Sequence, residues 1–280
     1  MRTACCDRLA MCHFKDAPLR VRPIAWLKNT TRNRMKQGLL GRLVAPGARE
    51  ATFDRVRIIS ATRMDERTFW KSSALGQSLA IRRNDPRLVF EIAFSNKAGL
   101  PKIYNAAIAG AGPRDALMFV HDDIWLDDPQ WLDKLLVALK RYDVVGLAGT
   151  RRRVPGQPAW LYTKVEEGRY YLDGQHLSGA VCHGPEAKGK VSYFGPSPAR
   201  CDLLDGLFIA ARADVLQGSR VGFDERFEFH FYDLDFCRTA SAAGLSIGTW
   251  PIMVTHQSTG AFTSAGWHKG HELYIGKWKS

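Results

Sequence analysis

Long apolar runs are missing from this sequence. No stretch approaches the roughly 18 consecutive apolar residues that a membrane-spanning helix needs. A secretory signal peptide is also not indicated, because Arg2, Asp7 and Arg8 interrupt any apolar segment at the start. From these two absences we expect a cytoplasmic protein.

Paired cysteines are absent as well. The sequence has six cysteines, Cys5, Cys6, Cys12, Cys182, Cys201 and Cys237. They form neither a C-x-x-C pair nor a compact framework, so neither structural zinc nor disulfide bonds are indicated. We also find no internal repeat. The hydrophobic fraction of 45% and charged fraction of 24% are those of an ordinary folded protein and exclude wholesale disorder.

Basic charge is plentiful but concentrated at one end of the chain. The formal net charge is +12. Residues 1–50 hold 11 Lys or Arg and 3 Asp or Glu, a surplus of 8, which leaves 29 basic against 25 acidic residues in the remainder. A nearly balanced body argues against nucleic acid as a partner.

The basic end contains apolar residues at helical spacing, Leu27, Met35, Leu39 and Leu43, among Lys and Arg. A basic amphipathic helix of this kind can make a peripheral contact with the inner face of a membrane. The alternative is a partly disordered leader or a helix packed on the body. We therefore treat residues 1–50 as a leader and residues 51–280 as a single domain, with an elaborated loop or hairpin region at 151–200.

Strand and helix patterns alternate along the body of the chain. Strands are expected at residues 56–61, 88–94, 116–120, 144–149 and 246–254, and helices at 103–111, 130–142 and 233–243. This alternation predicts an α/β fold with a mostly parallel central sheet flanked by helices. Ligands of such sheets collect beyond the carboxyl ends of the strands, where Thr62, Asn96 and the segment 121–123 fall.

Acidic residues follow the strand at 116–120. Asp122 and Asp123 place hard oxygen ligands where a divalent cation can hold a diphosphate, and His121 precedes them. Alone, such residues are often only turn or N-cap residues, a role that suits Asp127 and Asp128 better.

Two further chemistry-bearing positions lie downstream. Asp233 and Asp235 stand near the start of a helix and point in different directions, so one is a candidate general base and the other a first-turn charge. His256 follows the last strand. A lone strand-end histidine is more often structural than metal-binding, and His256 gains weight only from the other residues.

Taken in order, these segments resemble the GT-A glycosyltransferases of family two. The resemblance is to a bacterial branch in which the acidic triplet reads His-Asp-Asp or His-Gln-Asp, and it covers about residues 55–260. The matching segments are residues 96–105, 121–123, 204–208, 223–227, 232–237 and His256.

The resemblance implies the GT-A, or nucleotide-diphospho-sugar transferase, fold and a role for each matched residue. Asp123 would bind the metal, Asp122 the metal or the donor ribose, and His256 would be a further metal ligand. Asp233 matches the catalytic carboxylate. The residues that would cradle the nucleotide are Thr62, Arg63, Asn96, Lys102 and Asn105, and those near the sugar and acceptor are Asp205 and Gly206.

The implied activity is a metal-dependent, inverting hexosyl transfer that uses Mn²⁺ or Mg²⁺. It would move a sugar from a nucleotide-diphosphate sugar to a glycan or lipid-linked acceptor, in polysaccharide biosynthesis. The chain departs from the pattern at two positions. Tyr232 precedes Asp233 where the family commonly has an acidic residue, so the choice between Asp233 and Asp235 stays open, and His121 replaces the usual first Asp.

Two other functions are the alternatives. A nucleotidyltransferase can use a similar sheet and acidic metal site, but it typically needs a Gly- and Lys/Arg-rich loop early in the chain, and none appears after Ile59. A noncatalytic protein could bind membranes or nucleic acid through residues 1–50.

Overall fold

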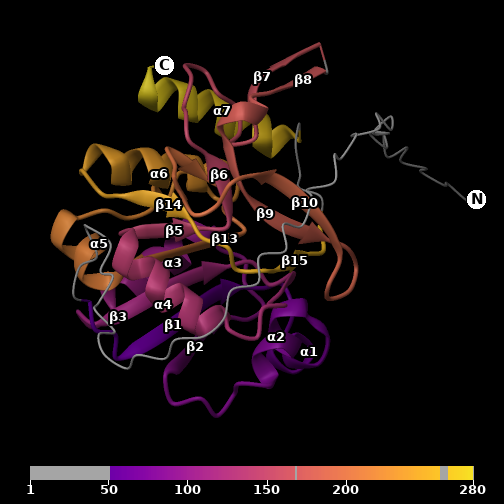
Figure 1. The fold of residues 1–280 in the computed structure, drawn as a ribbon, viewed down its shortest axis with the longest axis vertical. Helices are drawn as coiled ribbons and strands as arrows, with labels where there is room; N and C mark the ends of the chain where they lie inside the picture. The colour runs from indigo at the N-terminus through magenta and orange to yellow at the C-terminus, as the bar shows by residue number, and fades with distance from the viewer. Residues whose placement is uncertain (1–50, 168, 259–263, 280) are drawn as a thin grey trace, which may run out of the picture. The chain divides into compact units, whose positions relative to one another are not determined.

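The structure is a computed structural model that describes residues 51–167, 169–258 and 264–279, shown as a ribbon in Figure 1. The expected leader at residues 1–50, with its amphipathic helix and membrane contact, lies outside the described residues. In the part of the chain that is described, none of the helices has the length and apolarity needed to cross a lipid bilayer.

The larger sheet has seven strands in the order β11-β14-β5-β13-β3-β1-β2. These strands are β1 (Arg55–Ala61), β2 (Leu88–Ala93), β3 (Asp115–Val120), β5 (Val144–Gly146), β11 (Ala199–Arg200), β13 (Phe208–Arg212) and β14 (Ile247–Thr249). Five of them run in one direction, and only β13 and β11 run in the other. The expectation of a mostly parallel sheet is therefore confirmed.

A second sheet has the order β12-β6-β9-β15-β4, and β10 also pairs with β9. Its strands are β4 (Ile124–Trp125), β6 (Ala148–Thr150), β9 (Leu177–His183), β10 (Lys190–Gly195), β12 (Leu203–Leu204) and β15 (Thr255–His256). A separate hairpin joins β7 (Tyr162–Glu166) to β8 (Arg169–Leu172). The region at 151–200 thus consists mainly of antiparallel strands.

Seven α-helices are described. They are α1 (Glu66–Ser72), α2 (Ala74–Ala80), α3 (Leu100–Ala109), α4 (Trp131–Arg141), α5 (Ala213–Ser219), α6 (Tyr232–Ala242) and α7 (Ala265–Trp278), with a 3₁₀ turn at Gly174–His176. Helix α3 packs on β1 and β3, α4 on β5 and β13, and α6 on β12 and β14. Because helices and neighbouring strands enclose it, β3 is buried along its whole length, which explains its uninterrupted apolar run.

The chain passes repeatedly between the two sheets through short connections. Residues 121–123 join β3 to β4, and residues 205–207 join β12 to β13. The chain leaves β14 at Thr249 and enters the second sheet at β15, which contains His256. Residues matched to the metal and sugar sites therefore lie at the seam between the sheets.

Two strands expected to be continuous are divided by this seam. The strand expected at 144–149 separates at Leu147 into β5 and β6, which belong to different sheets. The strand expected at 246–254 is interrupted after Thr249, where Pro251 has no backbone N–H to donate to a ladder. The helix expected from residue 103 begins earlier, at Leu100, because Pro101 occupies its first turn instead of ending a loop.

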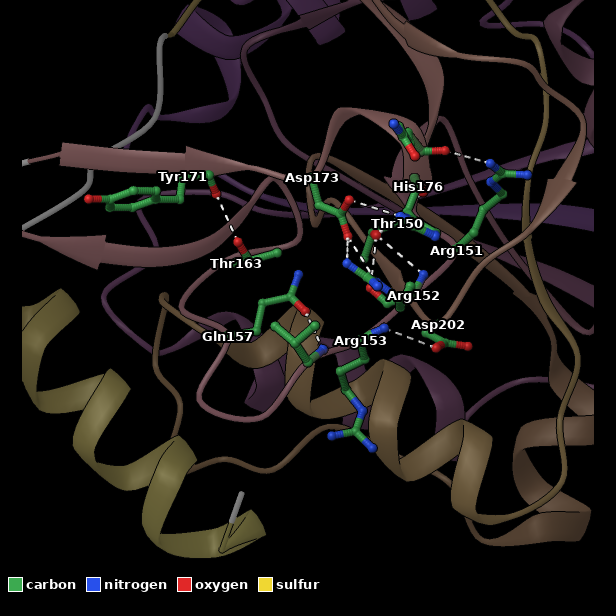
Figure 2. A network of polar contacts seen from close by, with 12 residues as sticks. Thr150, Arg151, Arg152, Arg153, Gln157, Thr163, Tyr171, Asp173, His176 and Asp202 are labelled. Carbon is green, nitrogen blue, oxygen red and sulfur yellow. Dashed lines mark hydrogen bonds and ion pairs between the residues drawn. The ribbon is translucent and has the colours of Figure 1, made fainter.

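A polar network braces the connection that carries the β7–β8 hairpin (Figure 2). Asp173 accepts hydrogen bonds from Arg152, with Nη2 at 2.5 Å from Oδ2, and its Oδ1 lies 2.8 Å from Nδ1 of His176. Arg151 donates to the backbone carbonyl of Gln175 at 2.6 Å. These contacts hold the two ends of the hairpin connection together.

Helix α7 is fixed to α6 by a buried ion pair. Asp235 is fully buried, and its carboxylate lies 2.7 Å from Nζ of Lys277 and accepts a hydrogen bond from Nε1 of Trp278 at 2.8 Å. Lys277 also pairs with Asp224 at 2.8 Å. Burial raises the pKa of Asp235, and the Lys277 ammonium opposes that rise.

The residue before α6 also rests on α7. Phe231, the N-cap residue of α6, has φ 65° and ψ 0°, in the left-handed region. Its ring stacks on Tyr274 at a centroid distance of 5.5 Å and lies 5.3 Å from the ring of Trp267. Helix α7 therefore holds both the entry to α6 and its first turn.

We predict that Lys277→Ala lowers the free energy of unfolding by about 3 kcal/mol, because it leaves the buried Asp235 carboxylate without its cation. Urea denaturation followed by circular dichroism measures this loss. Lys269→Ala is the matched control, because Lys269 is an exposed residue of α7 that forms no ion pair with a described residue. Equal stability of the two variants would contradict the proposed anchor.

Candidate active site

Three side chains converge where β4 and β15 pair. The ladder sets His256 opposite Ile124, the residue after Asp123, and Nε2 of His256 lies 3.3 Å from Oδ1 of Asp123. The backbone N–H of Gln257 donates to the Asp123 carbonyl at 3.0 Å. His121 completes the group, and the potential ligand atoms of His121, Asp123 and His256 all lie within 4.8 Å of one another.

These three residues fit a divalent metal ion. Asp123 Oδ1 is buried without a hydrogen bond of good geometry, although a buried carboxylate oxygen normally has one. Two imidazole nitrogens and one carboxylate oxygen form a donor set suited to a divalent transition-metal ion. Asp122 is not among the converging side chains, so its expected role at the metal stays a prediction.

Charge and burial oppose each other in this group. Burial disfavours the Asp123 carboxylate, but its close contact and charge interaction with His256 outweigh this and lower its pKa to about 2. Burial likewise lowers the pKa of His256, and Asp123 reverses the effect and raises it overall. The pKa of His121 is lowered by burial. Asp123 is therefore ionised at neutral pH, as a metal ligand must be.

A second group of contacts surrounds the backbone of Gly206. Its N–H donates to Oδ2 of Asp233 at 2.9 Å, and its carbonyl accepts from the Tyr232 hydroxyl at 2.8 Å. A Cβ atom on Gly206 would lie 2.5 Å from the Tyr232 hydroxyl oxygen and 3.0 Å from Cβ of Asp233. Glycine at this position is what allows the first turn of α6 to approach so closely.

Asp233 has an environment suited to a base. Burial, and then the charge of Asp205, raise its pKa to about 7, while the N–H groups of Leu234 and Gly206 limit the rise. Its carboxyl group therefore changes protonation near neutral pH, where a general base works best.

Asp235 is engaged elsewhere. Its carboxylate binds Lys277 and Trp278 of α7. Both of its oxygens have partners there, so it serves to anchor α7. The structure thus separates the two carboxylates that the sequence leaves as alternatives, and Asp233 is the one that contacts Gly206.

Residues expected to cradle the nucleotide fall into two groups. Thr62 and Asn96 lie together, because the Asn96 N–H donates to the Thr62 carbonyl at 2.8 Å where β1 and β2 end. The side chains of Arg63 and Lys102 are exposed and form no hydrogen bond or ion pair with a described residue. Asn105 is engaged, because its amide exchanges two hydrogen bonds of 2.8 Å with the backbone of Phe223.

His183 is a residue of this region that the sequence did not single out. It is the register partner of His256 in the parallel β9–β15 pair, and the two rings are 6.1 Å apart. Burial lowers the pKa of His183. The sequence analysis predicts no strand at residues 177–183, because they lie inside the region interpreted as elaborated loops or hairpins, so nothing marked this histidine as a strand-end residue.

A protein-family model described as "Glycosyltransferase like family" matches residues 79–273 of this chain. The chain belongs to this glycosyltransferase-like family. The matched range includes the three converging residues, Gly206 and Asp233. The sequence-based resemblance to GT-A glycosyltransferases is therefore confirmed at the level of the family, and so is the α/β fold class with its multistranded sheet.

Solved structures similar to this chain include other glycosyltransferases. Residues 1–349 of TarS from S. aureus give a TM-score of 0.43 at 15% identity, covering 72% of this chain and 60% of that one. The catalytic domain of Drosophila β1,4-galactosyltransferase 7, in complex with xylobiose, gives a TM-score of 0.40 at 10% identity, covering 78% of this chain and 79% of that one. The mannosyltransferase PcManGT from Pyrobaculum calidifontis, in complex with GDP-Man and Mn²⁺, gives a TM-score of 0.36 at 13% identity, covering 79% of this chain and 62% of that one.

The chain thus spans about 60% of the length of the TarS fragment. No curated protein matches the sequence. The family membership therefore rests on the family model.

We predict that Gly206→Ala lowers the free energy of unfolding by about 1–3 kcal/mol, because its methyl group has to displace Tyr232 and Asp233. Thermal or urea unfolding measures the change. Gly218→Ala is the control, because nothing lies within 4 Å of a Cβ there and the exposed position on α5 should gain slightly in stability. If both variants had the stability of the wild type, the close approach at Gly206 would be contradicted.

Proposed function

We propose that this protein transfers a sugar from a nucleotide-diphosphate sugar to an acceptor hydroxyl, with a divalent metal ion and with inversion at the anomeric carbon. The acceptor is a glycan or a lipid-linked precursor. The observation that carries the proposal is that Gly206 links the candidate base, Asp233, to the metal group. Its N–H holds the carboxylate of Asp233, and its carbonyl holds the Tyr232 hydroxyl, which contacts His121 of the metal group.

The metal group would face the donor's diphosphate. Asp123 and His256 would hold a divalent ion, and His121 lies beside them. A divalent cation bound there would neutralise the charge that develops on the leaving diphosphate. Thr62, Arg63 and Asn96 border the nucleotide just beyond the carboxyl ends of β1 and β2, and Lys102 borders it from the first turn of α3. The exposed side chains of Arg63 and Lys102 can approach phosphate oxygens there.

Asp233 activates the acceptor. Its ionised carboxylate removes the proton of the acceptor hydroxyl as that oxygen attacks the anomeric carbon, on the face opposite the departing diphosphate. The N–H of Gly206 fixes the direction of one carboxylate oxygen and leaves its second lone pair for the hydroxyl. Asp205, whose Oδ1 accepts from the Leu207 N–H at 3.0 Å, supplies a neighbouring negative charge that keeps Asp233 basic.

The family match favours sugar transfer over nucleotidyl transfer, which was the closest enzymatic alternative. No contact among the described residues favours a noncatalytic role. The donor can be identified by screening nucleotide sugars for metal-dependent release of the nucleoside diphosphate.

We expect kcat/KM to rise with pH and to level off above an apparent pKa of about 7, because only ionised Asp233 accepts a proton. Asp233→Asn should lower kcat by about 100- to 10,000-fold and leave donor binding intact. Initial rates across pH and donor titration calorimetry measure both effects. Asp214→Asn, which removes an exposed first-turn aspartate of α5, is the control. Near-normal turnover of Asp233→Asn would reject Asp233 as the base.

We expect chelation of divalent cations to abolish turnover in the wild type and added Mn²⁺ to restore it. Asp123→Ala should lose this restorable activity, because the half-buried Asp123 carboxylate is the only anionic member of the metal group. Asp54→Ala is the control, because Asp54 is exposed and pairs only with Arg114 among described residues. Full, chelator-resistant activity in Asp123→Ala would count decisively against the metal assignment.

A further inference from the structure

The two departures from the family pattern, His121 and Tyr232, contact one another. Nε2 of His121 lies 2.9 Å from the Tyr232 hydroxyl oxygen, although the residues are 111 positions apart in the sequence. The same hydroxyl donates to the Gly206 carbonyl at 2.8 Å. Both side chains belong to the proposed active site, one at the exit of β3 and the other in the first turn of α6.

This geometry selects one tautomer of His121. A carbonyl oxygen can only accept, so the single hydroxyl hydrogen of Tyr232 goes to Gly206. The Tyr232 oxygen then accepts a hydrogen bond from the Nε2–H group of His121, so the available lone pair of the ring is on Nδ1. If Tyr232 instead donated its hydrogen to Nε2 of His121, the buried Gly206 carbonyl would lose this donor. Phe229 lies alongside the His121 ring, with a centroid distance of 6.0 Å and an interplanar angle of 23°, and limits its tilt.

We propose that His121 binds the metal through Nδ1 and that Tyr232 is the positioning residue that fixes this tautomer. The proposal rests on the proposed function, since it concerns the same metal site. A metal-bound histidine commonly donates its other ring N–H to a neighbouring acceptor, which sets the tautomer and the ring direction. Here the acceptor is a tyrosine hydroxyl whose own hydrogen is committed to the backbone of Gly206.

The donor set also determines which ions are preferred. With His121 in place of a carboxylate, the protein supplies two neutral nitrogen ligands and one anionic oxygen ligand. Imidazole ligands suit transition-metal ions, whereas Mg²⁺ prefers oxygen ligands. The site should therefore bind Mn²⁺ in preference to Mg²⁺, and His121→Asp should shift the preference toward Mg²⁺.

Metal binding to the metal-free full chain tests the proposal without a sugar donor. Electron paramagnetic resonance of free Mn²⁺ gives the affinity of each variant. Tyr232→Phe should weaken Mn²⁺ binding by about 10- to 100-fold, the usual effect of losing such a supporting hydrogen bond. Circular dichroism establishes that the variant is folded.

Tyr274→Phe is the matched control. It removes the same atom from a buried tyrosine of α7 whose hydroxyl lies 3.5 Å from Nη1 of Arg238, a contact separate from those of the Tyr232 hydroxyl. Its Mn²⁺ affinity should equal that of the wild type. An equal loss in the two variants would assign the effect to packing of the aromatic cluster and overturn the proposal.

The tautomer itself can be observed directly. Long-range ¹H–¹⁵N spectra of protein labelled at histidine should show Nε2–H for His121 in the metal-free state, and Zn²⁺ should shift its Nδ1 resonance. A shift of Nε2 instead, or unchanged Mn²⁺ affinity in Tyr232→Phe, would overturn the proposal. Because none of these measurements needs turnover, they distinguish its failure from failure of the proposed sugar transfer.

Discussion

The first turn of α6 binds both the N–H and the carbonyl of Gly206, and the geometry of the candidate active site depends on these two contacts. Its N–H orients Asp233, and its carbonyl takes the hydroxyl hydrogen of Tyr232. Only a residue without Cβ allows the helix to come this close. The connection from β12 to β13 thereby sets both the direction of the proposed base and, through Tyr232, the state of His121. The backbone of one residue thereby orients groups from two other segments of the chain, the first turn of α6 and the end of β3.

The elements that the sequence predicted well are those whose burial follows a local pattern. The strand at 116–120 was predictable because β3 is buried on both faces and reads as an unbroken apolar run. The division of 144–149 between two sheets was not, since Leu147 is as apolar and buried as its neighbours. Which strand a backbone N–H will pair with depends on segments far along the chain, so local residue patterns do not specify where a strand changes sheets.

The candidate site was predictable to a similar degree. Asp123 and His256 could be selected by residue type and by their positions after strands, and the structure brings them together. Their functional roles stay predictions. The choice between Asp233 and Asp235 could not be made from the helix alone, because it depends on Lys277, which is 42 positions away from Asp235. Likewise, no local pattern indicates that the Asn105 amide is engaged by the backbone of Phe223, which is 118 positions away.

The left-handed conformation of Phe231 gives α7 a mechanical role. A residue with a Cβ atom pays roughly 1–2 kcal/mol of steric strain in that region, and Phe231 occupies it immediately before Tyr232 and Asp233. Its ring is held there by Tyr274 and Trp267, so packing against α7 sustains the strain. Helix α7 therefore maintains a strained backbone conformation at Phe231. Loss of this packing would let the backbone at Phe231 relax and turn the first residues of α6 away from Gly206. Packing on α7 in this way maintains the backbone strain immediately before the turn that carries Asp233.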